Sequence, residues 1–141
     1  MSMTLADYKV GIICCSGEDF PEGTISRVAT RLVLEKLRPD ETVTLCLPLF
    51  LAGGEVERAF ARVFPTIAVD GCSKKCAEMG TRKFSGKPVA TIVVSEVMKK
   101  YPQFKAKSRE KLNAEEMKLA MKVAEEIAKK VDEILCKKTK K

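Results

Sequence analysis

Short apolar runs alternate with amphipathic stretches along most of the chain. The runs are rich in β-branched residues and are bounded by Gly, Pro or Asp, as buried strands often are. They predict strands at residues 8–14, 42–47, 66–69 and 89–94. Because a loop and a helical pattern follow the runs, the order of elements is typical of a parallel sheet.

The segments between the runs carry apolar residues at helical spacing. The first helix is expected to begin at a Thr24 N-cap and to stop at Arg38–Pro39. A second helix opens at Gly54 and ends before Pro65, and a short one surrounds Cys76. This pattern predicts a three-layer α/β fold, flavodoxin-like or Rossmann-like, with a mainly parallel four-stranded sheet in the order 2-1-3-4.

An amphipathic pattern over residues 113–135 predicts a long C-terminal helix. Asn113 and Glu116 suit the N-cap and N3 positions of a capping box. The apolar stripe is too short to favour a coiled coil, so we expect it to pack on the sheet of the same chain. The predicted stripe consists of Met117, Met121, Ala124, Ala128, Val131 and Leu135.

The composition fits one domain over residues 1–141. Of the 141 residues, 45% are hydrophobic, which is enough for a core without disulfides. No basic leader precedes the first apolar run, and that run is too short for a secretion signal or a membrane span, so we expect a cytoplasmic protein with no membrane partner. Thiols stay reduced in the cytosol, and the six cysteines therefore favour metal binding or catalysis over disulfides.

The chain contains no histidine. This removes the commonest general base and mixed Cys/His zinc sites, and without a clear catalytic constellation the sequence does not favour an enzyme. The net charge of +7 comes with widely spread lysines and few aromatic residues, which does not favour nucleic acid either. A metal ion is the predicted partner, while a protein partner or a second copy stays open.

Three predicted strands each bring cysteine to the same edge of the sheet. Cys14 and Cys15 end the first strand, Cys46 lies near the end of the second, and Cys72 follows the third. Adjacent strands lie about 4.8 Å apart, so thiols at neighbouring carboxyl ends can share one ion. Successive strand residues point to opposite sides, so we assign Cys15 as a ligand and Cys14 as a core residue or an alternate ligand.

Cys72 and Cys76 lie four residues apart. On one helical turn their spacing places both sulfurs on the same face, and the start of a helix favours a thiolate at Cys72. Four thiolates suit a zinc ion and also an iron–sulfur cluster, and the vicinal Cys14 and Cys15 would suit a thiol redox protein. Any single cysteine can instead be a packing residue, which is the role we assign to Cys136.

Several motifs resemble the DGC domain family: Cys15-Ser16-Gly17, EKLRP at 35–39, Cys46-Leu47 followed by Gly53-Gly54, and above all DGCSKKC at 70–76. The resemblance spans about residues 8–98 and does not include the helix after Asn113. It implies a zinc site made by Cys15, Cys46, Cys72 and Cys76, and with it we prefer zinc to iron–sulfur. The role of the ion, whether structural, sensing or metal handling, does not follow from the sequence.

Overall fold

The computed structural model describes residues 9–17, 19–107 and 112–139. Tyr8, at the start of the first predicted strand, lies outside the described residues. None of the helices in the described part of the chain combines the length and apolar character that a membrane span needs. The elements follow in the order β1 (Val10–Cys14), α1 (Pro21–Leu32), the π-helical η2 (Val33–Leu37), β2 (Thr42–Val43), α2 (Leu47–Ala52), α3 (Glu55–Val63), β3 (Thr66–Asp70), α4 (Cys76–Phe84), β4 (Ala90–Val93), α5 (Val94–Met98) and α6 (Ala114–Thr139).

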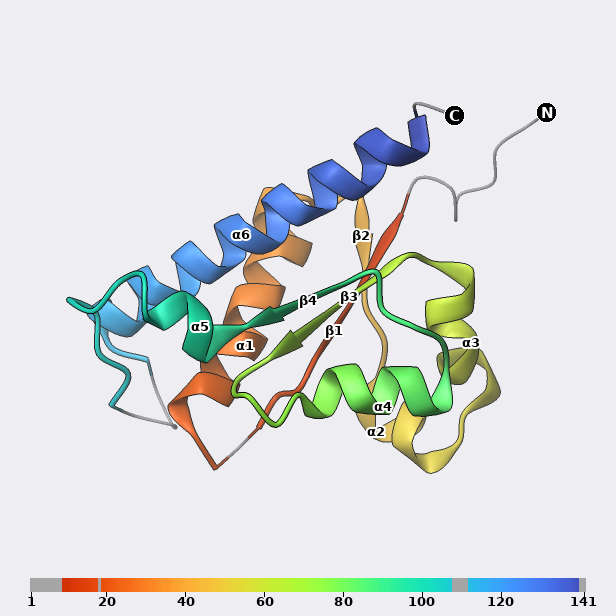
Figure 1. Ribbon diagram of the computed structural model, residues 1–141, viewed down its shortest axis with the longest axis horizontal. Helices are drawn as coiled ribbons and strands as arrows, with labels where there is room; N and C mark the ends of the chain where they lie inside the picture. Colours follow the sequence, from red (N-terminus) through yellow and green to blue (C-terminus); the bar gives the residue numbers. More distant parts are fainter. Residues whose placement is uncertain (1–8, 18, 108–111, 140–141) are drawn as a thin grey trace.

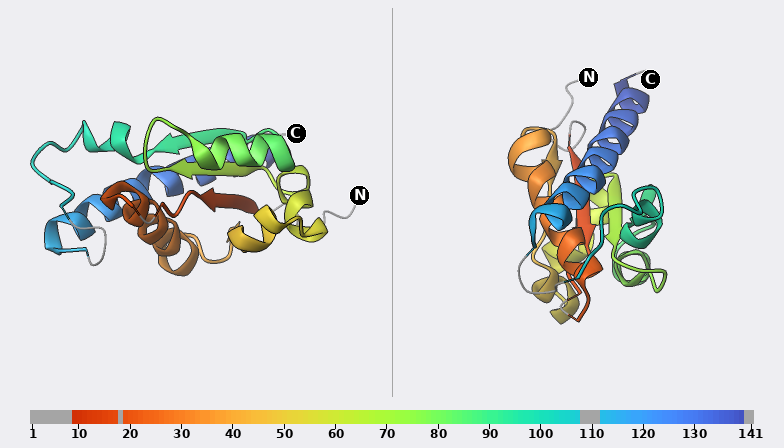
Figure 2. Two further views of the ribbon diagram at one scale, coloured as in Figure 1. Left: turned by 90° about the horizontal axis from the view of Figure 1, so that it is seen from below. Right: turned by 90° about the vertical axis from the view of Figure 1, so that its left-hand side faces the viewer.

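The four strands form one parallel sheet in the order β2-β1-β3-β4 (Figure 1). Val10 pairs with Thr42 on one side of β1, and Ile12 pairs with Ile67 on the other. All three strand pairs are parallel, and α1 and α4 lie on opposite sides of the sheet (Figure 2). The predicted α/β class, strand order and long C-terminal helix are therefore confirmed.

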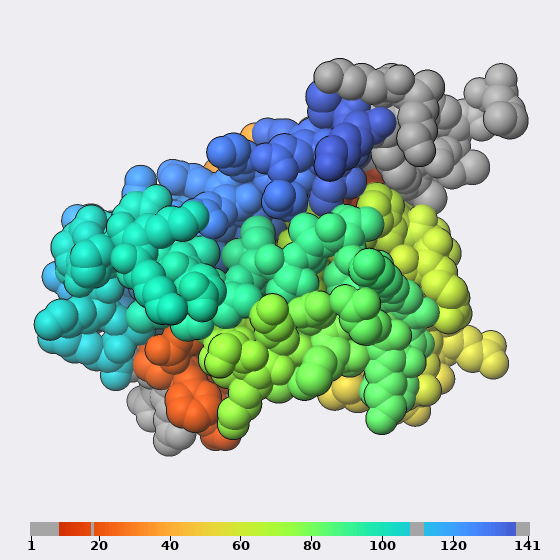
Figure 3. Space-filling view, viewed as in Figure 1, coloured from red at the N-terminus to blue at the C-terminus, as the bar shows by residue number. Residues whose placement is uncertain are grey.

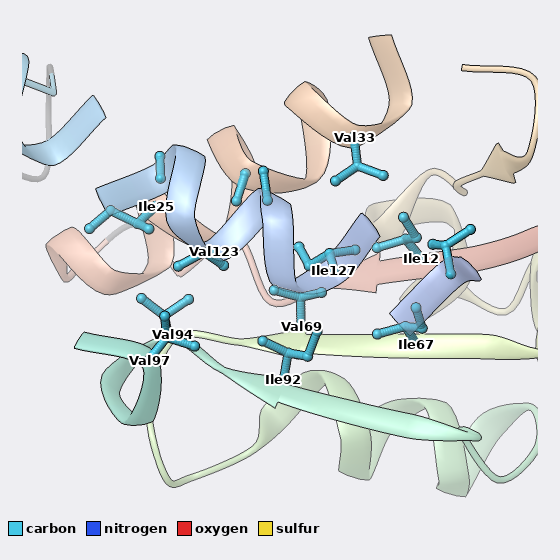
Figure 4. Close-up of a cluster of buried hydrophobic side chains, with 14 of the residues drawn as sticks. Ile12, Ile25, Val33, Ile67, Val69, Ile92, Val94, Val97, Val123 and Ile127 are labelled. Atoms are coloured by element: carbon cyan, nitrogen blue, oxygen red, sulfur yellow. The ribbon is translucent and has the colours of Figure 1, made fainter. Parts of the chain in front are cut away.

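The larger of two buried clusters lies between the sheet and helices α1, α5 and α6. Alternate strand residues such as Ile12 and Val69 face this cluster, together with Ile127 of α6 (Figure 4). A smaller cluster on the other face joins Ile13 and Ala68 to α3 and α4. The alternation follows from the period of two along a strand. The two clusters differ in size because α1, α5 and α6 contribute many more buried residues than α3 and α4.

Helix α6 packs within its own chain, as predicted, and its capping box is confirmed. The Glu116 N–H donates to Asn113 Oδ1 at 2.8 Å, and the Asn113 N–H donates to Glu116 Oε1 at 3.3 Å. The predicted stripe is partly wrong, because Met117 is 42% exposed. The helix contacts α1, η2, α5 and β1, so the buried arc is broad. Its fully buried hydrophobic members are Leu119, Ala120, Val123, Ala124, Ile127 and Val131.

Two predicted boundaries were wrong for local reasons. Helix α1 begins at Pro21 and holds Thr24 buried inside it; Pro is favoured at the first helical position because it lacks an N–H that would be unpaired there. Strand β2 stops at Val43, because the Thr44 hydroxyl donates to Ile12 O at 2.7 Å in place of a further backbone hydrogen bond. Pro48 then lies in the first turn of α2, a helix that we did not predict.

Candidate metal centre

Three glycines bring the loops at the carboxyl edge of the sheet into backbone contact. A Cβ atom on Gly23 would lie 2.0 Å from Gly17 O, and one on Gly71 would lie 2.9 Å from Gly23 N. The loop after β1, the start of α1 and the loop after β3 therefore touch without side chains between them. Figure 3 shows the start of α1 against the loop that precedes α4.

Three cysteine side chains line one cavity between these loops. The cavity has a volume of about 230 Å³. Its thiols come from two segments: Cys15 follows β1, while Cys72 and Cys76 lie in the turn after β3 and at the first residue of α4. The remaining walls include Asp19, Phe20, Glu22 and Lys74.

Cys15 is held by two polar neighbours. The Gly71 N–H donates to Cys15 Sγ at 3.2 Å, and the Ser26 hydroxyl lies 3.5 Å from the same sulfur. Ser26 is fully buried and donates its hydrogen to Gly23 O at 2.6 Å. In this arrangement the Cys15 thiol is the donor to Ser26, because a hydroxyl has only one hydrogen to give. If Cys15 loses its proton to become a ligand, the Ser26 hydroxyl can turn and donate to the sulfur.

The start of α4, and with it Cys76, is fixed by Asp70 at the end of β3. Asp70 Oδ1 accepts the Ala77 N–H at 2.6 Å, and Asp70 Oδ2 accepts the Glu78 N–H at 3.1 Å. The side chain is 1% exposed, and burial raises the pKa of this carboxyl although the two N–H donors act in the opposite direction. Asp70 thus satisfies two amides that the first turn of α4 would leave unpaired.

The prediction that Cys72 and Cys76 share a helical turn was wrong. Helix α4 begins only at Cys76, and Lys75 before it has a positive φ of 54°. The Lys75 N–H donates to Cys72 O at 3.2 Å, so a turn rather than a helix separates the two cysteines. Both thiols still line the same cavity, but the helix start belongs to Cys76 and not to Cys72.

The other three cysteines lie elsewhere. Cys46 is exposed just before α2 and is not among the residues that line the cavity. Cys14 packs against the larger core, where burial raises the pKa of its thiol. Its Sγ also lies 3.1 Å from Ser16 Oγ. Cys136 is exposed on α6, so the packing role that we predicted for it was wrong.

The thiols of the cavity suit a soft metal ion, but they would have to move closer together to bind one. In residues 9–17, 19–107 and 112–139, no three Cys, Asp or Glu side chains lie close enough together to hold one ion. The thiols of Cys15, Cys72 and Cys76 nevertheless share a cavity, and thiolates are preferred ligands of zinc. Recruiting Cys46 would require movement of the segment between β2 and α2.

The family model of the DGC domain matches residues 11–134 of the chain. The chain belongs to the DGC domain family. The match extends through most of α6, further than the motifs alone indicated, so this helix is part of the DGC domain. Neither a curated protein nor a solved structure matches the chain. Membership of the DGC domain family is consistent with a cysteine-rich metal-binding role.

Proposed function

We propose that this DGC domain binds a zinc ion in the cytosol through the thiolates of Cys15, Cys72 and Cys76, with Cys46 as the fourth ligand. The observation that carries the proposal is the convergence on one cavity of thiols from two segments far apart in the chain, Cys15 after β1 and the pair Cys72 and Cys76 between β3 and α4. Ordinary packing cysteines have no reason to converge in this way. The soft character of thiolates favours zinc over calcium or magnesium.

Metal binding would draw the exposed Cys46 toward the other three thiols. Cys46 follows a strand of only two residues and precedes a short helix, so few ladder hydrogen bonds oppose its movement. Four thiolates leave no open position for water on a tetrahedral zinc ion. We therefore propose a structural, sensing or metal-handling role and not hydrolysis.

The direct test is metal analysis with a visible spectrum on protein purified without oxygen. We expect about one zinc ion per chain and no visible absorption, because zinc has a filled d shell. A brown protein with stoichiometric iron would show that the same cysteines hold an iron–sulfur cluster and not zinc. A metal-free protein that also fails to take up added zinc would overturn the proposal.

Single Cys→Ser variants assign the ligands. We expect Cys15→Ser, Cys72→Ser and Cys76→Ser each to lower the zinc content, because serine is a poor zinc ligand. Cys46→Ser should weaken binding if that residue closes the site. Cys136→Ser is the matched control, since Cys136 is exposed on α6 and is not among the residues that line the thiol cavity. Equal zinc loss in the Cys136 variant would contradict the assignment.

A further inference from the structure

A second cavity lies on the other side of β1 from the loop after β3. It has a volume of about 410 Å³, at the lower end of the ~300–1,000 Å³ usual for small-molecule sites. The cavity exists because β2 ends at Val43, after which the chain leaves the sheet and separates from α1. Its walls combine Leu45 and Leu47 of the segment around Cys46 with Arg27, Thr30, Arg31 and Leu34 of α1 and η2.

One stripe along α1 and η2 forms a wall of this cavity. Arg27, Thr30, Arg31 and Leu34 follow the i, i+3, i+4, i+7 spacing of a single helical face, and all four line the cavity. The opposite stripe, with Ala29 and Val33, packs into the larger core. Leu34 belongs to the π-helical segment, a conformation that is found frequently at functional sites.

Two polar groups of this stripe, the Thr30 hydroxyl and the Arg27 guanidinium, are only weakly engaged within the protein. The Thr30 side chain is 2% exposed, yet its hydroxyl makes no hydrogen bond of ordinary geometry, although it lies near the Cys14 thiol. A thiol is a weak hydrogen-bonding partner, so this buried hydroxyl keeps the capacity to bond a ligand. One turn away, the exposed Arg27 guanidinium forms no ion pair with any residue that the structure describes. Arg31, by contrast, is paired with Glu35.

We propose that this cavity binds a small organic carboxylate. The carboxylate accepts hydrogen bonds from Arg27 and from the Thr30 hydroxyl, whose Cβ atoms lie about 5–6 Å apart on the helix surface. The apolar body of the ligand lies against Leu34, Leu45 and Leu47. Neither Arg27 nor Thr30 is a proposed zinc ligand, although Cys15 lines both cavities and Leu45 and Leu47 flank Cys46. The binding measurements are therefore made on metal-free and on zinc-loaded protein.

Binding of 4-phenylbutanoate and hexanoate, each compared with its neutral amide, tests the proposal. Saturation-transfer NMR and calorimetry on the full chain should show both acids binding and each amide about tenfold weaker, because the amide loses the charge-assisted hydrogen bonds. Arg27→Gln should weaken the acids about tenfold and leave the amides unchanged. Thr30→Val, which keeps the shape and removes the hydroxyl, should also weaken the acids.

Arg62→Gln is the matched control, because Arg62 lies on α3 and does not line the cavity. It should bind the acids like the unmodified protein. The proposal is overturned if neither acid binds, if acid and amide bind equally, or if the Arg62 variant loses as much affinity as the Arg27 variant. Because Arg27 is exposed at the surface, its variant should fold normally.

Discussion

The two faces of the sheet differ in how much core they carry. On one face, α1, α5 and α6 bury a large continuous cluster against alternate strand residues. On the other, only Ile13, Phe60, Ala68 and Ala77 form the buried part of the cluster beneath α3 and α4. Cys14 faces the first and Cys15 the second, so adjacent residues have different surroundings. The face with the larger core therefore carries most of the buried apolar contacts that stabilise the fold.

Truncation of the larger core should have the greatest effect on stability. Ile127→Ala removes a fully buried side chain of α6 and should lower the free energy of unfolding by about 2–5 kcal/mol, through lost transfer energy and the cavity left behind. Urea unfolding measures this change. Met117→Ala on the same helix, where the side chain is 42% exposed, should change stability by no more than about 0.5 kcal/mol. Equal effects of the two variants would contradict the description of α6 packing.

Gly71→Ala tests the backbone contact at the carboxyl edge. A Cβ there would lie 2.9 Å from Gly23 N and 3.0 Å from Glu22 C, so the loops must separate. We expect a loss of about 1–3 kcal/mol in stability and a lower zinc content.

Gly80→Ala is the control for this variant. Gly80 lies inside α4, and an added Cβ would meet nothing within 4 Å. Alanine should therefore leave the zinc content unchanged and raise the stability by about 0.5–1 kcal/mol, since glycine is a poor helix former. A variant of Gly71 that is as stable and as metal-rich as the Gly80 variant would refute the proposed loop packing.

Ser26→Ala tests the neighbour of the Cys15 sulfur. Groups that hydrogen-bond a metal ligand contribute about 10–100-fold to metal affinity, so we expect a loss of that order in zinc affinity by chelator competition. The fold should persist, because alanine is smaller than serine and favours a helix, although the Gly23 carbonyl loses one donor. Ser73→Ala, an exposed serine in the DGCSKKC motif, should bind zinc like the unmodified protein.

The smallest effect is expected from the ion pair that links η2 to α6. Arg38 Nε and Nη2 donate to Asp132 Oδ1 and Oδ2 at 2.8 Å and 2.7 Å. Since Asp132 is 54% exposed, Asp132→Asn should lower stability at neutral pH by less than about 1 kcal/mol. Packing, rather than this pair, should hold α6 in place.

The pH dependence of this pair has a definite sign. The hydrogen bonds from Arg38 lower the pKa of Asp132 below its ordinary value of 3.8. The pair therefore stabilises the fold above that value, and its contribution is lost as the pH falls through the lower pKa of the folded state. Thermal unfolding of both proteins should show their difference shrinking below pH 3.8. A difference that grows on acidification would contradict this assignment.

Sequence patterns predicted the sheet well because its strands are continuous apolar runs. β1 and β3 match their predicted ranges closely, and Pro39 and Pro65 follow the ends of η2 and α3 as expected. Local competition explains the failures. Pro21 starts a helix before the better capping residue Thr24, and Pro48 converts an apolar run that resembles a strand into α2.

The positions of the cysteines along the chain indicated the correct edge of the sheet, but not how the individual side chains are arranged there. Parallel topology brings Cys15 and Cys72 to that edge, whereas the left-handed turn at Lys75 has no clear sequence signal. Gly23 and Gly71 could have suggested close backbone approach. Ser26 could not have been found, because one serine in an amphipathic helix has no distinctive pattern. The four-cysteine ligand set stays a prediction.

The brevity of β2 has a consequence for self-association. A long strand at this edge would present a row of unpaired N–H and C=O groups to the strands of other molecules. Here the paired strand ends at Val43, and the Thr44 hydroxyl occupies the Ile12 carbonyl that a longer ladder would have used. Pro48 then turns the chain away into a helix. The features that open the second cavity thus also make this edge of the sheet a poor template for aggregation.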